Sequence, residues 1–385
     1  MATGREAKRI LVIKLRHIGD VLLTAPVFRA LKERFPAAYV AAAVNAGTEE
    51  MLSGNPHVDD IIVFDRGGRG WLKKAFKEAA FLAGIRKKRF DTVVDLTCND
   101  RSAILSFLSG AGMRMSSESL AARTGFKGKK HLYTHLTRIN DLHMVVQNLE
   151  FLKPLGAGAG APAFDLFIPQ EAKDFAGEIF KKHGIKDTDR VVHVHPASRW
   201  QFKCWKDDRM AGVMTRLMEK GVKVVLTSSP DKKEMARAGK ILSIASKSPA
   251  AESCLVDLCG KTGLKRLAAL STASSLFLGV DSAPMHMAAA VGTPVVALFG
   301  PSILWRWAPW DAAIMGVREA RDMKTFYGDG VYRIGRHAVI QRRWDCVPCR
   351  KDGCDGTKVS RCIDDITTGE VAALVLGGLA GRVKA

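Results

Sequence analysis

The sequence predicts an α/β protein with two domains, each built around a parallel β-sheet. Short apolar runs typical of buried strands alternate with segments of helical periodicity, and this alternation occurs twice along the 385 residues. Between the two halves, residues 153–162 are rich in Gly, Ala and Pro, which favours a mobile connection over a packed element. We therefore place the domains at residues 1–168 and 169–365.

The first half contains four predicted strands, at residues 9–15, 39–44, 61–64 and 92–96. Their continuous apolar runs are typical of parallel strands that are covered on both faces. Helical periodicity separates most of the strands. It is clearest in the spacing of Val21, Phe28, Leu31 and Phe35.

The second half repeats the pattern, with strands predicted at residues 191–195, 222–227, 276–280 and 294–299. Both halves are therefore expected to be Rossmann-like. Two such domains joined by a linker predict a cleft between the carboxyl ends of the two sheets, where loops and helix N-termini can bind a ligand.

The composition is ordinary for a folded globular protein, with 47% hydrophobic and 25% charged residues, and it excludes a disordered chain. No apolar segment approaches the roughly 18 to 20 residues of a membrane span, and the N-terminal residues lead directly into a strand. A cytoplasmic location is predicted. The formal net charge of +20 indicates an anionic partner, which could be nucleic acid, an acidic membrane surface or a phosphorylated substrate.

Asp20 is the candidate general base. It follows the first predicted strand and Gly19, at the start of a helix predicted to begin near Val21. Gly19 lets the backbone approach a ligand closely, and the carboxylate of Asp20 can accept a proton. The alternative is that Asp20 only caps the helix, as Asp often does.

The loop after residue 195 offers hydroxyl and cationic groups at the carboxyl end of a strand. Ser198, Arg199 and Lys203 lie there, and such groups suit a bound diphosphate.

A second candidate ligand site follows the strand at 276–280. Asp281 can hold backbone amides or a substrate hydroxyl, while Ser282 and the amides that follow, from Ala283, lie at the start of a small-residue helix that can bind phosphate. His286 can steady this loop, or it can be an ordinary buried histidine. Neither half carries a Gly-rich dinucleotide fingerprint or a P-loop, which argues against an oxidoreductase and a P-loop enzyme.

Three segments together resemble glycosyltransferase family 9, the ADP-heptose:lipopolysaccharide heptosyltransferases. They are Lys-Leu-Arg-His-Ile-Gly-Asp at 14–20 with Pro26, His-Pro-Ala-Ser-Arg-Trp-Gln-Phe-Lys-Cys-Trp at 195–205, and Gly-Val-Asp-Ser-Ala-Pro-Met-His at 279–286 continuing to Phe-Gly-Pro at 299–301. Their order and spacing cover nearly the whole chain. The Arg-Trp-Gln-Phe-Lys-Cys-Trp form is most similar to the branch-adding heptosyltransferase III group.

The resemblance implies a GT-B fold, in which the C-terminal domain binds most of the nucleotide-sugar donor. Asp20 would deprotonate an acceptor hydroxyl, which attacks the anomeric carbon of the heptose in a single, inverting displacement. Lys203, Ser198 and amides near Ser282 would offset the charge on the ADP leaving group, so no cofactor or metal is expected. The helix at residues 366–385 would pack back on the N-terminal domain.

Asp231 matches the acidic position expected near the nucleoside, where a carboxylate accepts hydrogen bonds from ribose hydroxyls, and Glu234 is a competing candidate. Ala197 departs from family members that carry a hydroxyl at its position, which leaves more of the phosphate contact to Ser198.

The implied acceptor is a lipid-anchored, phosphorylated lipopolysaccharide core oligosaccharide. The basic surface would guide the enzyme to the anionic inner face of the cytoplasmic membrane. Two alternatives stay open: another GT-B enzyme acting on a different nucleotide sugar, as a glycosyltransferase or an epimerase, and a basic nucleic-acid-binding protein, for which no recognition motif is present.

The cysteines near the C-terminus are a candidate structural zinc site, made of a Cys-x-x-Cys pair and two further thiols. These residues are Cys346, Cys349, Cys354 and Cys362. Reduced thiols that pack a loop are the favoured alternative in a reducing cytoplasm. The other four cysteines lie in or beside apolar segments and are predicted to be core residues.

Overall fold

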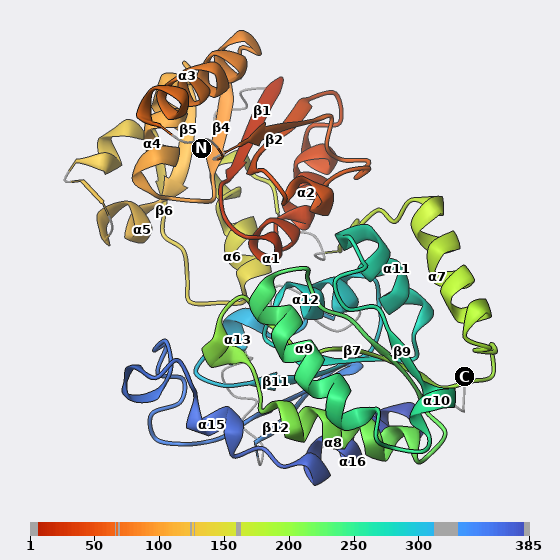
Figure 1. Ribbon diagram of the computed structural model, residues 1–385. Helices are drawn as coiled ribbons and strands as arrows, with labels where there is room; N and C mark the ends of the chain where they lie inside the picture. Colours follow the sequence, from red (N-terminus) through yellow and green to blue (C-terminus); the bar gives the residue numbers. More distant parts are fainter. Residues whose placement is uncertain are drawn as a thin grey trace. The chain divides into compact units, whose positions relative to one another are not determined.

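The computed structural model describes residues 7–65, 67, 70–123, 125–126, 128–158, 163–311 and 330–380 (Figure 1). The chain divides into two compact units, of which the first runs to Phe167 and the second begins at Ile168. The boundary predicted from the sequence lies one residue further along the chain.

In the first unit, six described strands form one parallel sheet in the order β3-β2-β1-β4-β5-β6. This is the doubly wound order of a Rossmann-like domain. The strands are β1 (Arg9–Lys14), β2 (Tyr39–Asn45), β3 (Asp60–Phe64), β4 (Thr92–Asp95), β5 (Met113–Ser117) and β6 (His135–Thr137). The α-helices are α1 (Ile18–Leu22), α2 (Ala25–Arg34), α3 (Trp71–Lys87), α4 (Asp100–Leu108), α5 (Glu118–Arg123) and α6 (Met144–Glu150), with short 3-10 helices η1 (Glu49–Met51), η2 (Lys129–Leu132) and η3 (Lys153–Leu155).

In the second unit, seven described strands form a sheet in the order β12-β13-β11-β10-β7-β8-β9, parallel except for β12. The strands are β7 (Val191–His195), β8 (Lys223–Leu226), β9 (Leu255–Asp257), β10 (Leu276–Val280), β11 (Val295–Phe299), β12 (Val331–Ile334) and β13 (His337–Gln341). The α-helices are α7 (Gln170–Lys182), α8 (Asp207–Met218), α9 (Lys232–Ala245), α10 (Ala251–Cys254), α11 (Leu264–Ala273), α12 (Ala283–Ala290), α13 (Leu304–Trp307), α15 (Arg361–Asp364) and α16 (Thr368–Ala380), with 3-10 helices η4 (Gln201–Lys203) and η6 (Cys354–Gly356).

The eight strands predicted from apolar runs are all present, within one or two residues at each end. The strands that the sequence did not indicate, β5, β6, β9, β12 and β13, are short or carry polar side chains such as Arg114 and His337. They add to the outer positions of each sheet, where neighbouring strands supply the pairing that a weak apolar pattern does not predict.

The first residues of the predicted linker, after α6, form a short packed element. Residues Lys153–Leu155 form η3 and Leu155 is buried, while residues 159–162 lie outside the described part of the chain. Further on, Asp165 accepts a hydrogen bond of 2.9 Å from Nε of Arg29, and its carbonyl accepts one from Asn55. These contacts tie residues up to the boundary onto the first unit.

The C-terminal helix packs on the second unit, which corrects the prediction that it returns to the N-terminal domain. Val371, Ala372, Val375 and Leu379 of α16 are buried in the same apolar cluster as Met210 and Met214 of α8. The helix contacts α8, β10 and β11. Its apolar stripe matches the apolar face of α8, and the burial of both stabilises this position. None of the described helices is long and apolar enough to span a membrane.

Candidate active site

Asp20 lies at the carboxyl end of β1, on the first turn of α1. The strand ends at Lys14, and α1 begins at Ile18, so Asp20 is the third residue of this short helix and is half-buried. The N-cap is His17, and no side-chain cap hydrogen bond is present. Asp20 is therefore not the cap, which removes the structural alternative considered from the sequence.

Lys14 is a buried cation beside Asp20, and the sequence motif alone did not assign it a role. Its Nζ donates to the carbonyl of Leu96 at 3.2 Å and to Oδ1 of Asn148 at 3.3 Å. Burial lowers the pKa of Lys14, and the nearby Asp20 carboxylate acts in the opposite direction. A buried lysine side chain thus lies close to the candidate base.

The loop that carries Asp20 rests on a second buried network at the end of β4. The amide of Leu15 donates to Oγ1 of Thr97 at 2.7 Å, and the amide of Thr97 donates to Oδ1 of Asp95 at 2.8 Å. The Tyr133 hydroxyl donates to the other Asp95 oxygen at 2.6 Å. Burial raises the pKa of Asp95, which is fully enclosed. These bonds hold the β1–α1 loop at a fixed position on the first sheet.

Lys203 and Asp281 form an ion pair at the edge of the second sheet. Lys203 lies in η4, after β7, and Asp281 follows β10 directly. The Lys203 Nζ donates to Asp281 Oδ2 at 2.6 Å, with the Asp281 side chain 4% exposed. Burial raises the pKa of Asp281, but the Lys203 ammonium and the Ser302 hydroxyl outweigh it, and the net pKa is below its usual range. Asp281 is held ionised, and it fixes the position of the cation.

Ser282 supplies a free hydroxyl next to this pair. It is the N-cap residue of α12, and its Oγ is buried without a hydrogen-bond partner among the described residues. Ala283 is the first residue of the helix, whose initial amides have no partner within the helix. A hydroxyl, open amides and a lysine ammonium at one strand end are donors that suit a bound anion.

Gly279 is required for the close approach of β10 to β7. A Cβ atom at this position would lie 2.8 Å from the carbonyl oxygen of His195 and 2.7 Å from the Phe277 ring. Any larger residue would therefore displace the strand that carries Asp281. His286, one turn into α12, is 5% exposed, and its ring centroid lies 6.4 Å from that of Trp307. His286 thus packs inside the loop that it was predicted to steady.

Ser198 and Arg199 are adjacent in the chain but lie in different environments, the first buried and the second exposed. Ser198 is 5% exposed, and its hydroxyl oxygen accepts the amide of Trp200 at 3.3 Å. Its own amide donates to the Cys204 Sγ at 3.3 Å, which shapes the loop before Lys203. Arg199 is exposed, with its guanidinium 5.6 Å from the centroid of the Trp200 ring. The structure therefore encloses the serine in the loop and leaves the arginine on its outer side.

Asp231, predicted to lie near the nucleoside, caps α9 through one of its carboxylate oxygens. Its Oδ1 accepts the amides of Lys233 at 2.9 Å and Glu234 at 3.3 Å. Glu234, the competing candidate, is 8% exposed and points back to the strand ends, where its Oε2 accepts the amide of Ser229 at 3.1 Å. The two acidic residues lie within one helical turn, so sequence alone did not decide between them.

Two buried histidines support the same edge. His193 and His195, on β7, both lie within 3.0 Å of the Thr227 hydroxyl. Burial lowers the pKa of His195 to about 4 and that of His193 to about 3. The 3.9 Å approach of His195 to Glu234 is therefore a contact of a neutral imidazole with a carboxylate near neutral pH.

The model of glycosyltransferase family 9 (heptosyltransferase) matches residues 79–328. The chain belongs to this family. Lipopolysaccharide heptosyltransferase 3 of Escherichia coli K12 is 32% identical over 308 residues, which cover 78% of this chain and 85% of that protein. The family resemblance noted in the sequence motifs is confirmed, and the chain is a glycosyltransferase.

Solved structures of family 9 proteins share the fold. A glycosyl transferase family 9 protein from Veillonella parvula DSM 2008 has a TM-score of 0.80 at 23% identity, with 99% of this chain and 100% of that chain covered. The E. coli ADP-heptose lipopolysaccharide heptosyltransferase II has a TM-score of 0.72 at 19% identity, with 97% and 99% covered. The GT-B fold class predicted from the sequence is confirmed.

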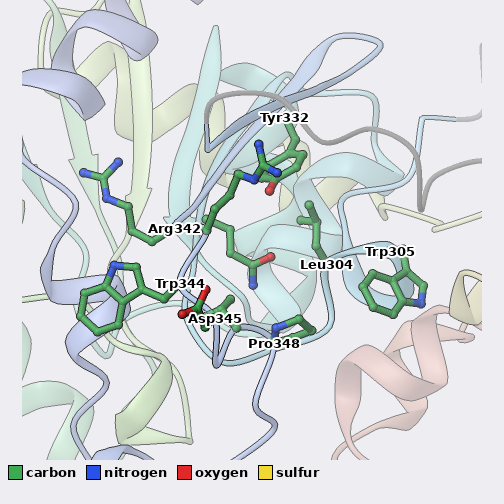
Figure 2. Close-up of a pocket in the computed structure, with 10 residues that line it drawn as sticks. Leu304, Trp305, Tyr332, Arg342, Trp344, Asp345 and Pro348 are labelled. Carbon is green, nitrogen blue, oxygen red and sulfur yellow. The ribbon is translucent and has the colours of Figure 1, made fainter.

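In this glycosyltransferase, the second unit contains a cavity of about 250 Å³, lined by residues of α13, β12, β13 and the loop that follows β13. Figure 2 shows Trp305 and Trp344 at its opposite ends. Gln341 links the cavity to the pair, because its Nε2 donates at 2.8 Å to the carbonyl of Ser302, whose hydroxyl contacts Asp281. The residues that line this cavity belong to none of the three family motifs, so the sequence did not indicate it.

The four C-terminal cysteines are not arranged as the predicted zinc site. Within the described ranges, no group of three or more His, Cys, Asp or Glu residues could hold a metal ion. All four are free thiols, with Cys346 exposed and Cys362 buried. Burial and the neighbouring cysteines raise the pKa of Cys362 to about 11. The other cysteines, Cys98, Cys204, Cys254 and Cys259, are buried, as predicted.

Proposed function

We propose that this enzyme transfers heptose from ADP-heptose to a sugar hydroxyl of the lipopolysaccharide inner core, with inversion at the anomeric carbon and without a metal ion. The observation that carries the proposal is the Lys203–Asp281 pair beside the free Ser282 hydroxyl and the start of α12. Such a set of fixed donors suits the diphosphate of a nucleotide sugar.

The donor diphosphate lies against Lys203, Ser198, Ser282 and the first amides of α12, from Ala283. As the bond from the anomeric carbon to the phosphate oxygen breaks, negative charge grows on the departing ADP. The Lys203 ammonium offsets that charge, and it is already held in place by Asp281 at 2.6 Å. A preorganised protein cation performs the role that a divalent ion has in other glycosyltransferases, which is the reason for proposing metal-independent transfer.

Asp20 acts as the general base. Its carboxylate accepts the proton of the acceptor hydroxyl as that oxygen forms a bond to the anomeric carbon from the face opposite ADP. One bond forms and one breaks in the same displacement, so the configuration inverts and no covalent enzyme intermediate occurs. Lys14 is buried close to this carboxylate, in the first sheet that carries the loop. Gly19, the residue before Asp20, has no side chain and so lets the acceptor approach the backbone.

The nucleoside lies at the end of β8, near Glu234. This carboxylate faces the strand ends and can accept hydrogen bonds from the ribose hydroxyls, while Asp231 holds α9 in place. The E. coli structure named for ADP-heptose supports adenosine as this nucleoside.

The acceptor in this proposal is a phosphorylated core oligosaccharide on a lipid anchor, at the anionic inner face of the cytoplasmic membrane. The name of the 32%-identical relative supports a lipopolysaccharide acceptor, and the net charge of +20 complements phosphate groups on the oligosaccharide and the membrane.

Isothermal titration calorimetry of the full chain with ADP-heptose, ADP and UDP-glucose, in buffer containing EDTA, tests the donor and the metal independence together. We expect ADP-heptose and ADP to bind and UDP-glucose to bind at least tenfold more weakly. Preference for UDP-glucose would overturn the donor, and binding only after Mg²⁺ is added would overturn the metal independence. Transfer to a core oligosaccharide, followed by NMR of the new anomeric proton, tests the inversion.

A further inference from the structure

Helix α3 of the first unit has two apolar faces, and only one of them is covered. Phe81 and Ile85 are buried against the sheet, in a cluster that includes Phe64 of β3. Figure 1 shows α3 beside α4 on this unit. One covered stripe is what a surface helix of a globular protein requires, so a second apolar stripe needs a separate explanation.

The second stripe is formed by Leu72, Phe76, Ala79 and Ala83, which follow the i, i+4, i+7, i+11 spacing of one helix face. All four are exposed, Leu72 at 64% and Phe76 at 75%. Trp71, at the first position of the helix, is 76% exposed. Large apolar side chains gathered in this way on one element mark an interaction surface, unlike the scattered exposed apolar residues of any protein.

Basic side chains surround this stripe. Lys73 lies beside it on the helix surface, and Arg86 and Lys87 follow in the last turn. Glu78 is the one acidic residue of the helix, and Arg101 pairs with it. Lys77 points away from the stripe and contacts Asp65 at 2.5 Å and the carbonyl of Gly67.

We propose that the face of α3 formed by Trp71, Leu72, Phe76, Ala79 and Ala83, with its flanking lysines, binds an anionic lipid bilayer. A helix with exposed Trp, Phe and Leu side chains beside lysines lies in the plane of a membrane interface, with the apolar face among the acyl chains and the ammonium groups at the lipid phosphates. A second copy of this chain fits less well, because each copy has a net charge of +20. The inference rests on the proposed function in one respect: an acceptor that is anchored in a membrane explains why the enzyme would bind one.

Cosedimentation of the full chain with vesicles tests this surface. Equimolar phosphatidylglycerol and phosphatidylcholine vesicles are compared with phosphatidylcholine alone. The wild type is expected to bind the anionic vesicles, and the double variant Leu72→Ser/Phe76→Ser to bind at least about tenfold more weakly. Lys73→Gln should weaken binding at low salt, and its difference from the wild type should shrink as salt is raised, because salt screens the charge that was lost. Ile244→Ser is the matched control, because Ile244 is a 39% exposed apolar residue on α9 of the second unit.

ADP binding and transfer to a lipid-free core oligosaccharide, measured on the same variants, separate this inference from the proposed function. Both are expected to equal the wild type in Leu72→Ser/Phe76→Ser, while transfer to an acceptor embedded in anionic vesicles falls. Equal vesicle binding by the wild type and this variant would overturn the inference. A change in its oligomeric state, by sedimentation velocity, without a loss of vesicle binding would assign the face to a protein contact. Vesicle binding without any heptose transfer would leave the surface standing and overturn the proposed function.

Discussion

The carboxyl edges of the two sheets differ in how firmly they hold their charged groups. At the edge of the second sheet, the Lys203 ammonium and the buried Asp281 carboxylate are joined at 2.6 Å. At the edge of the first, Asp20 is half-buried on a five-residue helix and is not engaged as its cap. A cation that offsets leaving-group charge has to be in place before the reaction, whereas a base has to meet a large acceptor and then release its proton. We infer that the donor side is preorganised and the acceptor side is open.

The largest expected effect comes from removing the base. Asp20→Ala should lower kcat by at least about a hundredfold, since general-base effects are on the order of 10² to 10⁴. ADP affinity by calorimetry should stay at the wild-type level, because Asp20 belongs to the other sheet. Glu33→Ala on α2 is the control for loss of an acidic side chain from this unit. Wild-type turnover in Asp20→Ala would end the assignment of Asp20 as the base.

Acid should destabilise the second unit selectively. The pKa values of His193 and His195 in the folded chain are about 3 and about 4, below the ordinary value of 6.5. At a pH between the folded and the ordinary value, the unfolded chain therefore binds more protons than the folded chain. Stability is therefore lost as the pH falls from about 6.5 to about 4, with His195 alone contributing on the order of 3 kcal/mol.

The first unit provides the comparison for this acid effect. Burial raises the pKa of Asp95, so this group favours folding at low pH and loses that contribution as the pH rises through its folded pKa. Hydrogen exchange at pH 7 and pH 5, corrected for intrinsic rates, should show loss of protection in β7 and β8 but not in β4. His195→Asn should reduce the loss of protection at pH 5. Equal loss of protection in both sheets would contradict the expected difference between the two units.

Removing the cation tests whether the donor edge is preorganised. Lys203→Ala should weaken ADP binding and lower kcat, each by about tenfold or more, and it should also destabilise the fold because Asp281 stays buried and unpaired. The double variant Lys203→Ala/Asp281→Asn removes the unpaired charge. It should recover much of the stability in urea unfolding without recovering ADP binding. Recovery of both would show that Lys203 acts only through structure.

The smallest expected effect separates the two carboxylates of α9. Glu234→Gln should weaken ADP binding by a few-fold to about tenfold, as loss of a charged hydrogen-bond acceptor does, with little change in stability. Asp231→Ala should instead cost about 1 kcal/mol of stability through the lost cap and leave ADP affinity nearly unchanged. The reverse pattern would restore Asp231 as the nucleoside ligand.

Most of the donor-side site could be predicted from the sequence because it follows strands with strong apolar runs. Asp281 and Ser282 come directly after β10, and Lys203 comes within a few residues of β7. The ends of parallel strands meet at one edge, so local pattern is sufficient to bring such residues together. Ser302 and Gln341 could not be found in this way, because the sequence around them shows no pattern that assigns a contact with the site.

The placement of the C-terminal helix and the exposed face of α3 also escaped sequence reasoning. An apolar stripe indicates that a helix face is covered without indicating by what, and α16 is covered by α8 of its own unit. Helix α3 has apolar residues on two faces, so the periodicity of its sequence does not indicate which face is buried. Only the packed structure shows that Phe81 is buried while Phe76 is 75% exposed.

The sequence by itself determined the two α/β units, the positions of eight strands, the family and the strand ends at which chemistry is proposed, because these depend on local apolar period and on short motifs. The tertiary structure decided which charges pair, which acidic residue of α9 is a cap and which faces stay uncovered. Those outcomes depend on the distances and burial of side chains far apart in the chain, such as the 78 residues between Lys203 and Asp281, and no local pattern encodes them.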